Sequence, residues 1–388
     1  MSKLSKFSLI LGTSLLFSAC GGGGSGTEPD GDNGNPDPGT GGGEQSTLQQ
    51  EFAKWLEDMS SNHIEAGYQA LLADSQMLNQ QVATFCALTS PSQSDLTALE
   101  QKWLAASQKW QSIQWLKVGP IIDESRIFRF QFWPDSNDAV AKGVRTLLAR
   151  QEVVTSEYVS GRNVGAQGFP ALETLIFADE PQTSLLTAHN KQKRCEVLSA
   201  ISANVSNMAD EVVTAWSATG GNYRTRFVEG TGEFSGQVDV VEEVVTNWLE
   251  QLERIKDEKM LTPSAEGPPG LPLMAESHIS DTSLQNIKTN INSLIAIYTA
   301  NDGHGFDDIL NDHLEQGTIA TEMLEALTRA HTKINELNGS YDFALNQEQS
   351  RAVLQEVIEA LRDFRTVLSA DFIQAMDINI GFNSNDGD

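Results

Sequence analysis

Basic residues are scarce in this sequence. Only 26 of its 388 residues are Lys or Arg, against 53 Asp or Glu, and the formal net charge is −27. Nucleic-acid binding needs clustered Lys and Arg for the phosphates, and attraction to anionic lipid headgroups needs a polybasic patch. We therefore expect no nucleic-acid partner and no polybasic membrane-binding surface.

The motifs of two large hydrolase classes are also missing. The chain contains no His-Glu-x-x-His, the zinc-binding helix motif of many metallopeptidases. It contains no Ser/His/Asp pattern with a nucleophile elbow. No segment alternates apolar and polar residues convincingly enough to predict a sheet. The missing strand pattern favours a helical protein, and the missing motifs exclude these two kinds of catalytic site.

Only three cysteines occur, and the first follows a secretory signal. Two lysines precede a mostly apolar run over residues 7–17, which is too short to span a bilayer. The five residues ending at Cys20, LFSAC, resemble a bacterial lipobox, in which the cysteine is lipidated and becomes the mature N-terminus. The alternative is ordinary signal cleavage with Cys20 as a bystander. We expect residues 1–19 to be a lipoprotein signal peptide. Because Gly21 and not Asp follows the cysteine, we expect an outer-membrane lipoprotein that faces the periplasm or the cell surface.

Residues 20–46 read as a flexible tether. Between Gly21 and Gln45 lie 11 of the 31 glycines, without any aromatic residue, Lys or Arg. Such a segment cannot bury enough apolar area to offset its chain entropy. From Thr47 onward the chain has 48 acidic and 24 basic residues, so the acidity belongs to the folded part and not to the tether.

The remaining cysteines, Cys86 and Cys195, favour a disulfide, because an exported compartment is oxidising. The bond would close a loop of about 110 residues and stabilise the fold by roughly 3–5 kcal/mol in the chain-entropy model. The alternative is two separate buried thiols.

Apolar residues recur at helical spacing along most of the chain. One stripe runs from Leu96 through Trp103 and Trp110 to Ile113, and a second from Val238 through Trp248 to Ile255. We expect their tryptophans to lie in a core and not to form a stacking platform. A third stripe covers residues 353–368. Further long helices are expected near residues 47–88, 184–218, 281–299 and 318–337.

The pattern predicts an all-α protein with two up-and-down helical bundle domains, residues 47–182 and 183–388. The spacing of Asn346 and Gln349 predicts a capping box that starts the last long helix. The irregular segments between the helices, such as residues 120–134 and 262–274, are where a functional site is expected.

A weak internal repeat links the two halves. The sequence Glu-Ser-x-Ile occurs at residues 124–127 and again at 276–279, each time after a Trp-containing helix and a break. A Gly-Phe pair then begins a helix in each half, at Gly168 and at Gly305. This order predicts a duplication in which like segments of the two bundles face each other.

The most distinctive stretch is residues 165–177, where glycines precede a predicted helix with Pro170 in its first turn. It resembles the signature of the imelysin-like family of bacterial surface and periplasmic proteins, Gly-x-His-x-x-Glu followed by an apolar and aromatic run. The resemblance covers essentially residues 47–388. The supporting segments are Trp103 and Trp110, the run from Pro120 to Phe130, residues 277–287, and Gly303 to Phe306. It implies an all-helical protein of two bundles, a functional groove between them, and a tie to bacterial iron acquisition, often as an iron-regulated lipoprotein.

One position departs from this signature. Gly168 and Glu173 match it, but Pro170 stands where the family has His. A His-x-x-Glu pair on one helix face could share a metal, and the family's peptidase label depends on that pair. Proline supplies no ligand, so Glu173 alone is half a site. We therefore expect no catalytic residue of this kind and place a ligand-binding groove at Glu124, Arg126, Gly168, Phe169, Glu173, Glu276, Ser277, His278 and Asp281.

Structural alternatives exist for several of these residues. Glu124 and Arg126 could form an ion pair. Glu173 could be a buried carboxylate bonded to backbone or to Arg126, since an unpaired buried charge costs several kcal/mol. His278 could be a hydrogen-bonded interface residue and not a ligand.

A second candidate metal site is the segment with His304, Asp307 and Asp308. Its spacing matches no calcium loop, and the alternative is a polar turn.

We expect an envelope-anchored, non-enzymatic binding protein linked to iron uptake. It would hold iron, haem or another small ligand, or an envelope partner protein, in the groove. Carboxylates are hard oxygen ligands that suit ferric iron. Two alternatives remain. One is a metal-dependent peptidase in which Glu173 is assisted by ligands from elsewhere, and the other is a structural interaction module for an envelope redox or transport partner.

Overall fold

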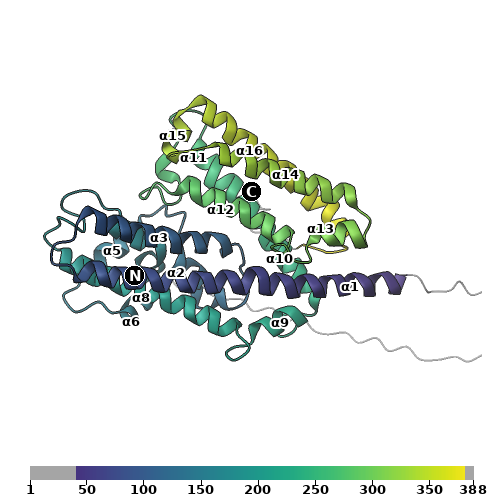
Figure 1. Ribbon diagram of the computed structural model, residues 1–388, viewed down its shortest axis with the longest axis horizontal. Helices are drawn as coiled ribbons and strands as arrows, with labels where there is room; N and C mark the ends of the chain where they lie inside the picture. The colour runs from purple at the N-terminus through teal and green to yellow at the C-terminus, as the bar shows by residue number, and fades with distance from the viewer. Residues whose placement is uncertain (1–40, 381–388) are drawn as a thin grey trace, which may run out of the picture. The chain divides into compact units, whose positions relative to one another are not determined.

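The computed structural model describes residues 41–380, with side chains from Thr47 onward. The predicted signal peptide, Cys20 and residues 20–40 of the predicted tether lie outside this range. Within it, all regular structure is helical, which confirms the predicted fold class (Figure 1).

A long helical rod opens the described chain. It consists of α1 (Gly41–Asp58), the π-helical segment η1 (Met59–Glu65) and α2 (Ala66–Ala87), which follow each other without a break (Figure 1). The rod begins earlier than the predicted helix at Thr47, because extending a formed helix costs far less than nucleating one.

The helix α3 (Gln93–Ile113) begins at a capping box. The hydroxyl of Ser92 accepts from the N–H of Asp95, and the carboxylate of Asp95 accepts from the N–H of Ser92 at 2.8 Å. The predicted apolar stripe of this helix, from Leu96 through Trp103 and Trp110 to Ile113, is buried throughout. Its tryptophans therefore belong to the core, as expected.

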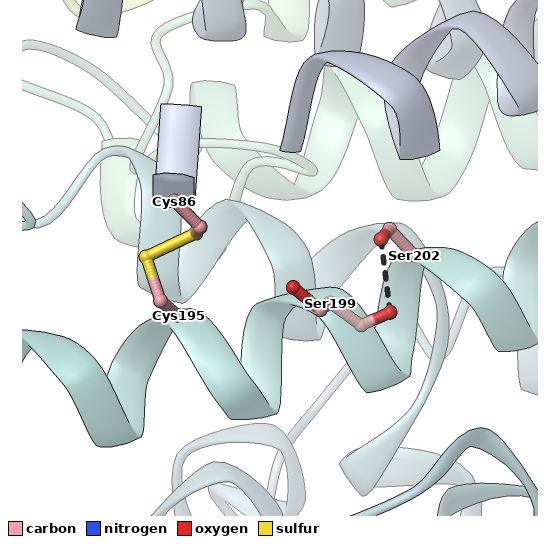
Figure 2. Close-up of a disulfide and its surroundings, with 4 residues drawn as sticks. All are labelled: Cys86, Cys195, Ser199 and Ser202. Atoms are coloured by element: carbon pink, nitrogen blue, oxygen red, sulfur yellow. Dashed lines mark hydrogen bonds between the residues drawn. A yellow bond between two sulfur atoms is a disulfide. The ribbon is translucent and has the colours of Figure 1, made fainter. Parts of the chain in front are cut away.

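The rod packs against α3 and against α8 (Lys191–Trp216). The hydroxyl of Ser202 on α8 donates to the side-chain carbonyl of Asn79 on α2 at 2.9 Å. Figure 2 shows the predicted disulfide, which joins Cys86 near the end of α2 to Cys195 on α8. The two Cα atoms are 5.6 Å apart.

The later helices form a second packed group. In chain order they are α10 (Gln237–Glu253), which continues through η5 (Arg254–Leu261) into α11 (Thr262–Ser264), then α12 (Ser283–Tyr298), α14 (Gly317–Glu336) and α16 (Glu348–Val367). Helices α14 and α16 run side by side (Figure 1). Helix α12 contacts both α14 and α3, so it joins the two groups.

Shorter elements fill the connections. They are η2 (Gly119–Ile121), η3 (Asp123–Ser125), α4 (Arg126–Phe130), α5 (Ala139–Ala149), α6 (Ser156–Ser160), η4 (Val164–Ala166), α7 (Gly168–Ile176), α9 (Tyr223–Glu229), η6 (Pro272–Met274), α13 (Phe306–Asp308), η7 (Ile309–His313), α15 (Tyr341–Asn346), η8 (Leu368–Phe372) and α17 (Ile373–Ala375).

The predicted capping box at Asn346 is wrong. Asn346 is the last residue of α15, and its side-chain amide donates to the carbonyl of Asp342 in the preceding turn at 2.8 Å. Helix α16 begins at Glu348, and its N-cap residue Gln347 makes no side-chain capping bond. The Asn346 side chain is bonded within its own short helix, α15, and is not available to cap the next one. Residue spacing alone does not reveal this.

The predicted domain boundary at 182/183 stays a prediction. The contacts gather the described residues from Gly42 onward into one unit. Helix α8, which follows that boundary, packs mainly on α2 of the first half. The predicted duplication likewise stays a prediction, although Ser125 and Ser277 in the two Glu-Ser-x-Ile segments share a left-handed conformation, with φ of 58° and 53°. Among the described helices, none combines the length and apolar character needed to cross a bilayer.

Candidate ligand-binding site

Helix α7 begins where its backbone closely approaches another segment. Gly168 has φ of +73°, and a Cβ atom placed on it would lie 2.3 Å from the carbonyl oxygens of Arg129 and Phe130. Both the conformation and the contact require glycine. The end of α4 is thereby held against the first turn of α7.

The next residue, Phe169, fixes α7 to the core. Its ring is fully buried, and its carbonyl accepts a hydrogen bond from the indole N–H of Trp103 on α3 at 3.1 Å. Gly168 and Phe169 therefore position the predicted site.

Glu173 lies one turn further along α7 and is only 4% exposed. Its Oε1 accepts two hydrogen bonds from Ser280, one from the backbone N–H at 2.8 Å and one from the hydroxyl at 2.7 Å. Burial raises the pKa of Glu173 to about 7, against the opposing effect of the Ser280 hydrogen bonds, and the nearby carboxyl of Glu276 adds to the rise. The carboxyl of Glu173 is therefore partly protonated near neutral pH.

Glu276 is buried beside it but has several partners. The ammonium of Lys259 lies 2.8 Å from its Oε2, and the amides of Asn286 and Gln131 donate to it at 3.1 and 3.2 Å. Burial opposes its ionisation, but the charge of Lys259 and its hydrogen bond outweigh burial and lower the pKa of Glu276. This carboxylate is therefore ionised.

Lys259 is held by three acceptors. Besides Glu276, it donates to the side-chain carbonyl of Gln111 on α3 at 2.9 Å and to that of Asn290 on α12 at 2.6 Å. The residue is 2% exposed, so the ammonium depends on these contacts. The network ties η5, α3 and α12 together behind Glu276.

A cavity of about 370 Å³ lies beside Glu173 and Gln131. Its walls come from residues 131–141, from α7 and from the loop at residues 273–279. The lining residues are Gln131, Phe132, Trp133, Asp135, Asp138, Val140, Ala141, Pro170, Glu173, Thr174, Leu273, Ser277, His278 and Ile279. The cavity therefore combines aromatic and aliphatic walls with a few polar groups, as small-molecule sites commonly do.

One polar atom at this wall lacks a partner. Gln131 is 6% exposed, and its amide nitrogen donates to Glu276, but its Oε1 is buried without a hydrogen bond. A buried unsatisfied acceptor costs about 1–3 kcal/mol. The oxygen is covered by neighbouring atoms, so a ligand donor that displaced them and reached it would recover that free energy.

The structure brings together only some of the predicted groove residues. Glu173, Ser277 and His278 line the cavity, and Glu276 lies directly behind Gln131. The side chain of His278 is exposed. Asp281 lines a neighbouring cavity of about 290 Å³, which also contains His278, and accepts a hydrogen bond from the N–H of Tyr341 at 3.3 Å.

Glu124 and Arg126 do not line the cavity. The guanidinium of Arg126 bonds the carboxylate of Glu211 on α8 at 3.0 Å and the carbonyl of Pro120, also at 3.0 Å. Glu124 is 70% exposed and lies 3.8 Å from Arg126, so this pair is a surface contact. The alternative in which Arg126 holds Glu173 is wrong, because Glu173 is bonded to Ser280.

The segment at His304 packs onto the N-terminal rod. His304 Nε2 lies 2.8 Å from the carboxylate of Glu51, and its backbone N–H donates to Asp58 at 2.7 Å. Among the side chains described, from Thr47 to residue 380, no three His, Cys, Asp or Glu are arranged to hold a metal ion. The polar-turn alternative describes this segment better than the metal site.

Sequence reasoning missed Gln131, Ser280 and Lys259. Lys259 stands four residues after Ile255, at the next position of the second apolar stripe, and a charge at a core position is a signal for a buried pair. Ser280 directly follows the repeated Glu-Ser-x-Ile segment. Gln131 carried no signal in the sequence. It lies in an aromatic run, and the residue that it bonds, Glu276, is 145 residues away.

Comparison with known families identifies the family to which this chain belongs. The family model described as Imelysin (Peptidase M75) matches residues 64–368, which is more than half of the chain. The chain therefore belongs to the imelysin family, as its resemblance implied.

Two solved structures are similar to this chain. One is an imelysin-like protein from Psychrobacter arcticum, with a TM-score of 0.72 and 18% identity, covering 86% of this chain and 98% of the other. The second is described as an iron-regulated protein A precursor from Parabacteroides distasonis, with a TM-score of 0.67 and 17% identity, covering 84% and 95%. At these identities the likeness concerns the fold alone. A comparison with curated proteins gives no match.

Proposed function

We propose that the protein is a non-enzymatic binding protein linked to iron uptake, with its ligand site in the cavity beside Glu173. The observation that carries this proposal is the cavity wall at Gln131, where a buried acceptor has no partner within the protein. The walls come from distant parts of the chain, α7 and residues 273–279, as expected for a groove between two halves.

The state of the signature residues favours binding over metal-dependent catalysis. Pro170 lines the cavity at the position where the resemblance places His, and its side chain has no atom that could ligate a metal. The Oε1 of Glu173 already accepts two hydrogen bonds from Ser280. The pair that would share a metal is therefore reduced to one carboxyl, and Ser280 already bonds one of its two oxygens.

The link to iron and to the envelope has separate support. The protein from Parabacteroides distasonis with this fold is described as iron-regulated. The lipobox-like sequence at Cys20 and the glycine-rich segment after it suit a tethered outer-membrane lipoprotein. We propose that the folded part is held near the membrane by this tether, where it meets its ligand.

Isothermal titration calorimetry tests the proposal. The full chain carrying Cys20→Ser, which removes the proposed lipid attachment, is titrated with ferric citrate, ferrioxamine B, ferrous sulfate and haemin. We expect at least one of these to bind. Ala141 lines the cavity, so Ala141→Phe should abolish that binding while the matched Ala141→Ser retains it. Failure of all four probes to bind would reject the link to iron.

One observation favours a second candidate, a metal-dependent peptidase. A buried carboxyl with a pKa of about 7 in a cavity has the property of a general base, and Glu173 has it. This candidate requires chelator-sensitive peptide cleavage that disappears in Glu173→Gln. Cleavage that persists unchanged in this variant would come from a contaminating enzyme and would remove the candidate.

A further inference from the structure

We infer that the cavity beside Glu173 takes a small organic cation, an ammonium or guanidinium group carried on an apolar body. This inference rests on the proposed function, because it names the ligand class of the same cavity. It is carried by the charges of the lining residues, by the unpartnered acceptor of Gln131, and by the apolar share of the walls.

The lining residues carry charge of one sign. The carboxylates of Asp135 and Asp138 line the cavity, Glu173 adds a carboxyl that is only partly ionised near neutral pH, and no Lys or Arg is among the lining residues. Asp135 accepts the backbone N–H groups of Ala139 and Val140, both at 2.8 Å, so its carboxylate is held at the start of α5. A cavity with this balance attracts cations and repels anions.

Two basic side chains lie near the ring of the lining residue Trp133, Arg254 at 5.8 Å and Lys259 at 6.0 Å from its centre, and both are paired with carboxylates. Lys259 is bonded to Glu276, and Arg254 lies 3.4 Å from Glu258 and donates to the carbonyl of Trp133 at 2.6 Å. Both cations lie outside the set of residues that line the cavity. Their charges are therefore offset by Glu276 and Glu258.

The acceptors at the wall call for a ligand with N–H or O–H donors. The Oε1 of Gln131 is buried and unpartnered, and the carboxyl of Glu173 receives its bonds at Oε1 from Ser280. An ammonium has several donors and no acceptor, so it can satisfy such a wall without leaving a polar atom unpaired.

A bare metal ion suits the cavity less well than an organic cation. Zinc-type sites take three or more converging protein ligands, and no three His, Cys, Asp or Glu side chains converge in this way in the part of the chain that the structure describes. Phe132, Trp133, Val140 and Leu273 present apolar surface to the cavity instead. Aromatic walls favour an apolar body and add attraction for a cation over a ring face.

Calorimetry with three matched probes tests the inference. The Cys20→Ser protein is titrated with 2-phenylethylamine, 2-phenylethanol and 3-phenylpropionate, which share a ring and a short chain but differ in charge. We expect the amine to bind about tenfold or more tightly than the alcohol, and the carboxylate not to bind. Among iron probes, ferrioxamine B, which has a free amine, should bind more tightly than its N-acetyl derivative.

Two variants locate the amine. Gln131→Leu removes the free acceptor and should weaken amine binding about tenfold. Because it also removes a donor to Glu276, Asn286→Leu is the matched control: Asn286 donates to the same carboxylate but does not line the cavity. This control should leave amine binding unchanged.

Each outcome decides the inference separately from the proposed function. Tighter binding of the alcohol or the carboxylate than of the amine, absence of amine binding, or amine binding that survives Ala141→Phe would each overturn the inference. If the iron probes still bind in a manner that Ala141→Phe abolishes, the proposed function stands without it. If the amine binds as expected but no iron probe does, the cation site stands and the link to iron falls.

Discussion

Replacing Glu173 by Gln is expected to stabilise the protein at pH 8. Burial raises the pKa of Glu173 from 4.5 to about 7. A tenfold change in an acid dissociation constant corresponds to about 1.4 kcal/mol, so the ionised form lowers the free energy of unfolding by about 3 kcal/mol in all. Glutamine keeps a carbonyl oxygen that can accept both Ser280 hydrogen bonds, and it carries no charge.

The direction of the pH dependence follows from the raised pKa. Well below pH 4.5 the carboxyl is protonated in both the folded and the unfolded chain, and its full contribution to stability is present. As pH rises toward 7, the unfolded chain releases this proton first, so unfolding becomes easier. Above pH 7 the contribution is lost, and most of the loss develops between pH 5 and pH 8.

Urea unfolding followed by tryptophan fluorescence measures this effect, since Trp103 contacts α7 through the Phe169 carbonyl. The quantity of interest is the difference in unfolding free energy between Glu173→Gln and the wild type at pH 5 and at pH 8. Glu322→Gln, at an exposed position of α14, is the matched control. If the difference in unfolding free energy between Glu173→Gln and the wild type is the same at both pH values, the raised pKa of Glu173 is refuted.

Three further changes test contacts that hold the site and the fold together. Gly168→Ala should destabilise the protein by more than about 2 kcal/mol, because it adds a Cβ in a left-handed conformation against two carbonyl oxygens, as measured by urea unfolding. Lys259→Met should cost about 3–5 kcal/mol by leaving the Glu276 carboxylate buried without its counter-charge, and adding Glu276→Gln should recover much of that loss. Replacing both Cys86 and Cys195 by Ser should lower the unfolding free energy by roughly 3–5 kcal/mol, which a thermal-unfolding comparison with the oxidised wild type detects.

Each of these changes has a control or a contradicting result. Gly161→Ala adds a Cβ with no atom closer than 3.8 Å and should cost much less than Gly168→Ala. If Lys259→Met and the double variant are equally stable, the ion pair does not hold Glu276. If reduction of the wild type leaves its unfolding temperature unchanged, the disulfide contributes nothing to stability.

Much of the fold could be predicted from the sequence because helices are local. The stripe from Leu96 to Ile113 predicts both a helix and its buried face, since each residue reports the environment of the next turn. The cysteines could be paired from compartment and number alone. The capping box at Asn346 failed because the same residue type also ends helices, and spacing alone does not separate the two roles.

The site could be predicted only in part. Gly168 and Glu173 stand out within one local stretch, and the repeated Glu-Ser-x-Ile segment pointed to Glu276 and Ser277. The partners that decide the chemistry come from elsewhere: Ser280 bonds a carboxyl 107 residues away. Such contacts depend on how helices pack, and a single sequence contains no direct record of that packing.

The titration of the four iron probes into the wild-type cavity and into its blocked form tests the central claim most directly. In the Cys20→Ser background, we expect ferric citrate, ferrioxamine B, ferrous sulfate or haemin to bind, and we expect Ala141→Phe to abolish that binding while Ala141→Ser preserves it. Binding that is equally tight in the Ala141→Phe protein, or no binding of any probe to the open cavity, would contradict the claim that this cavity is the site of an iron-linked binding protein.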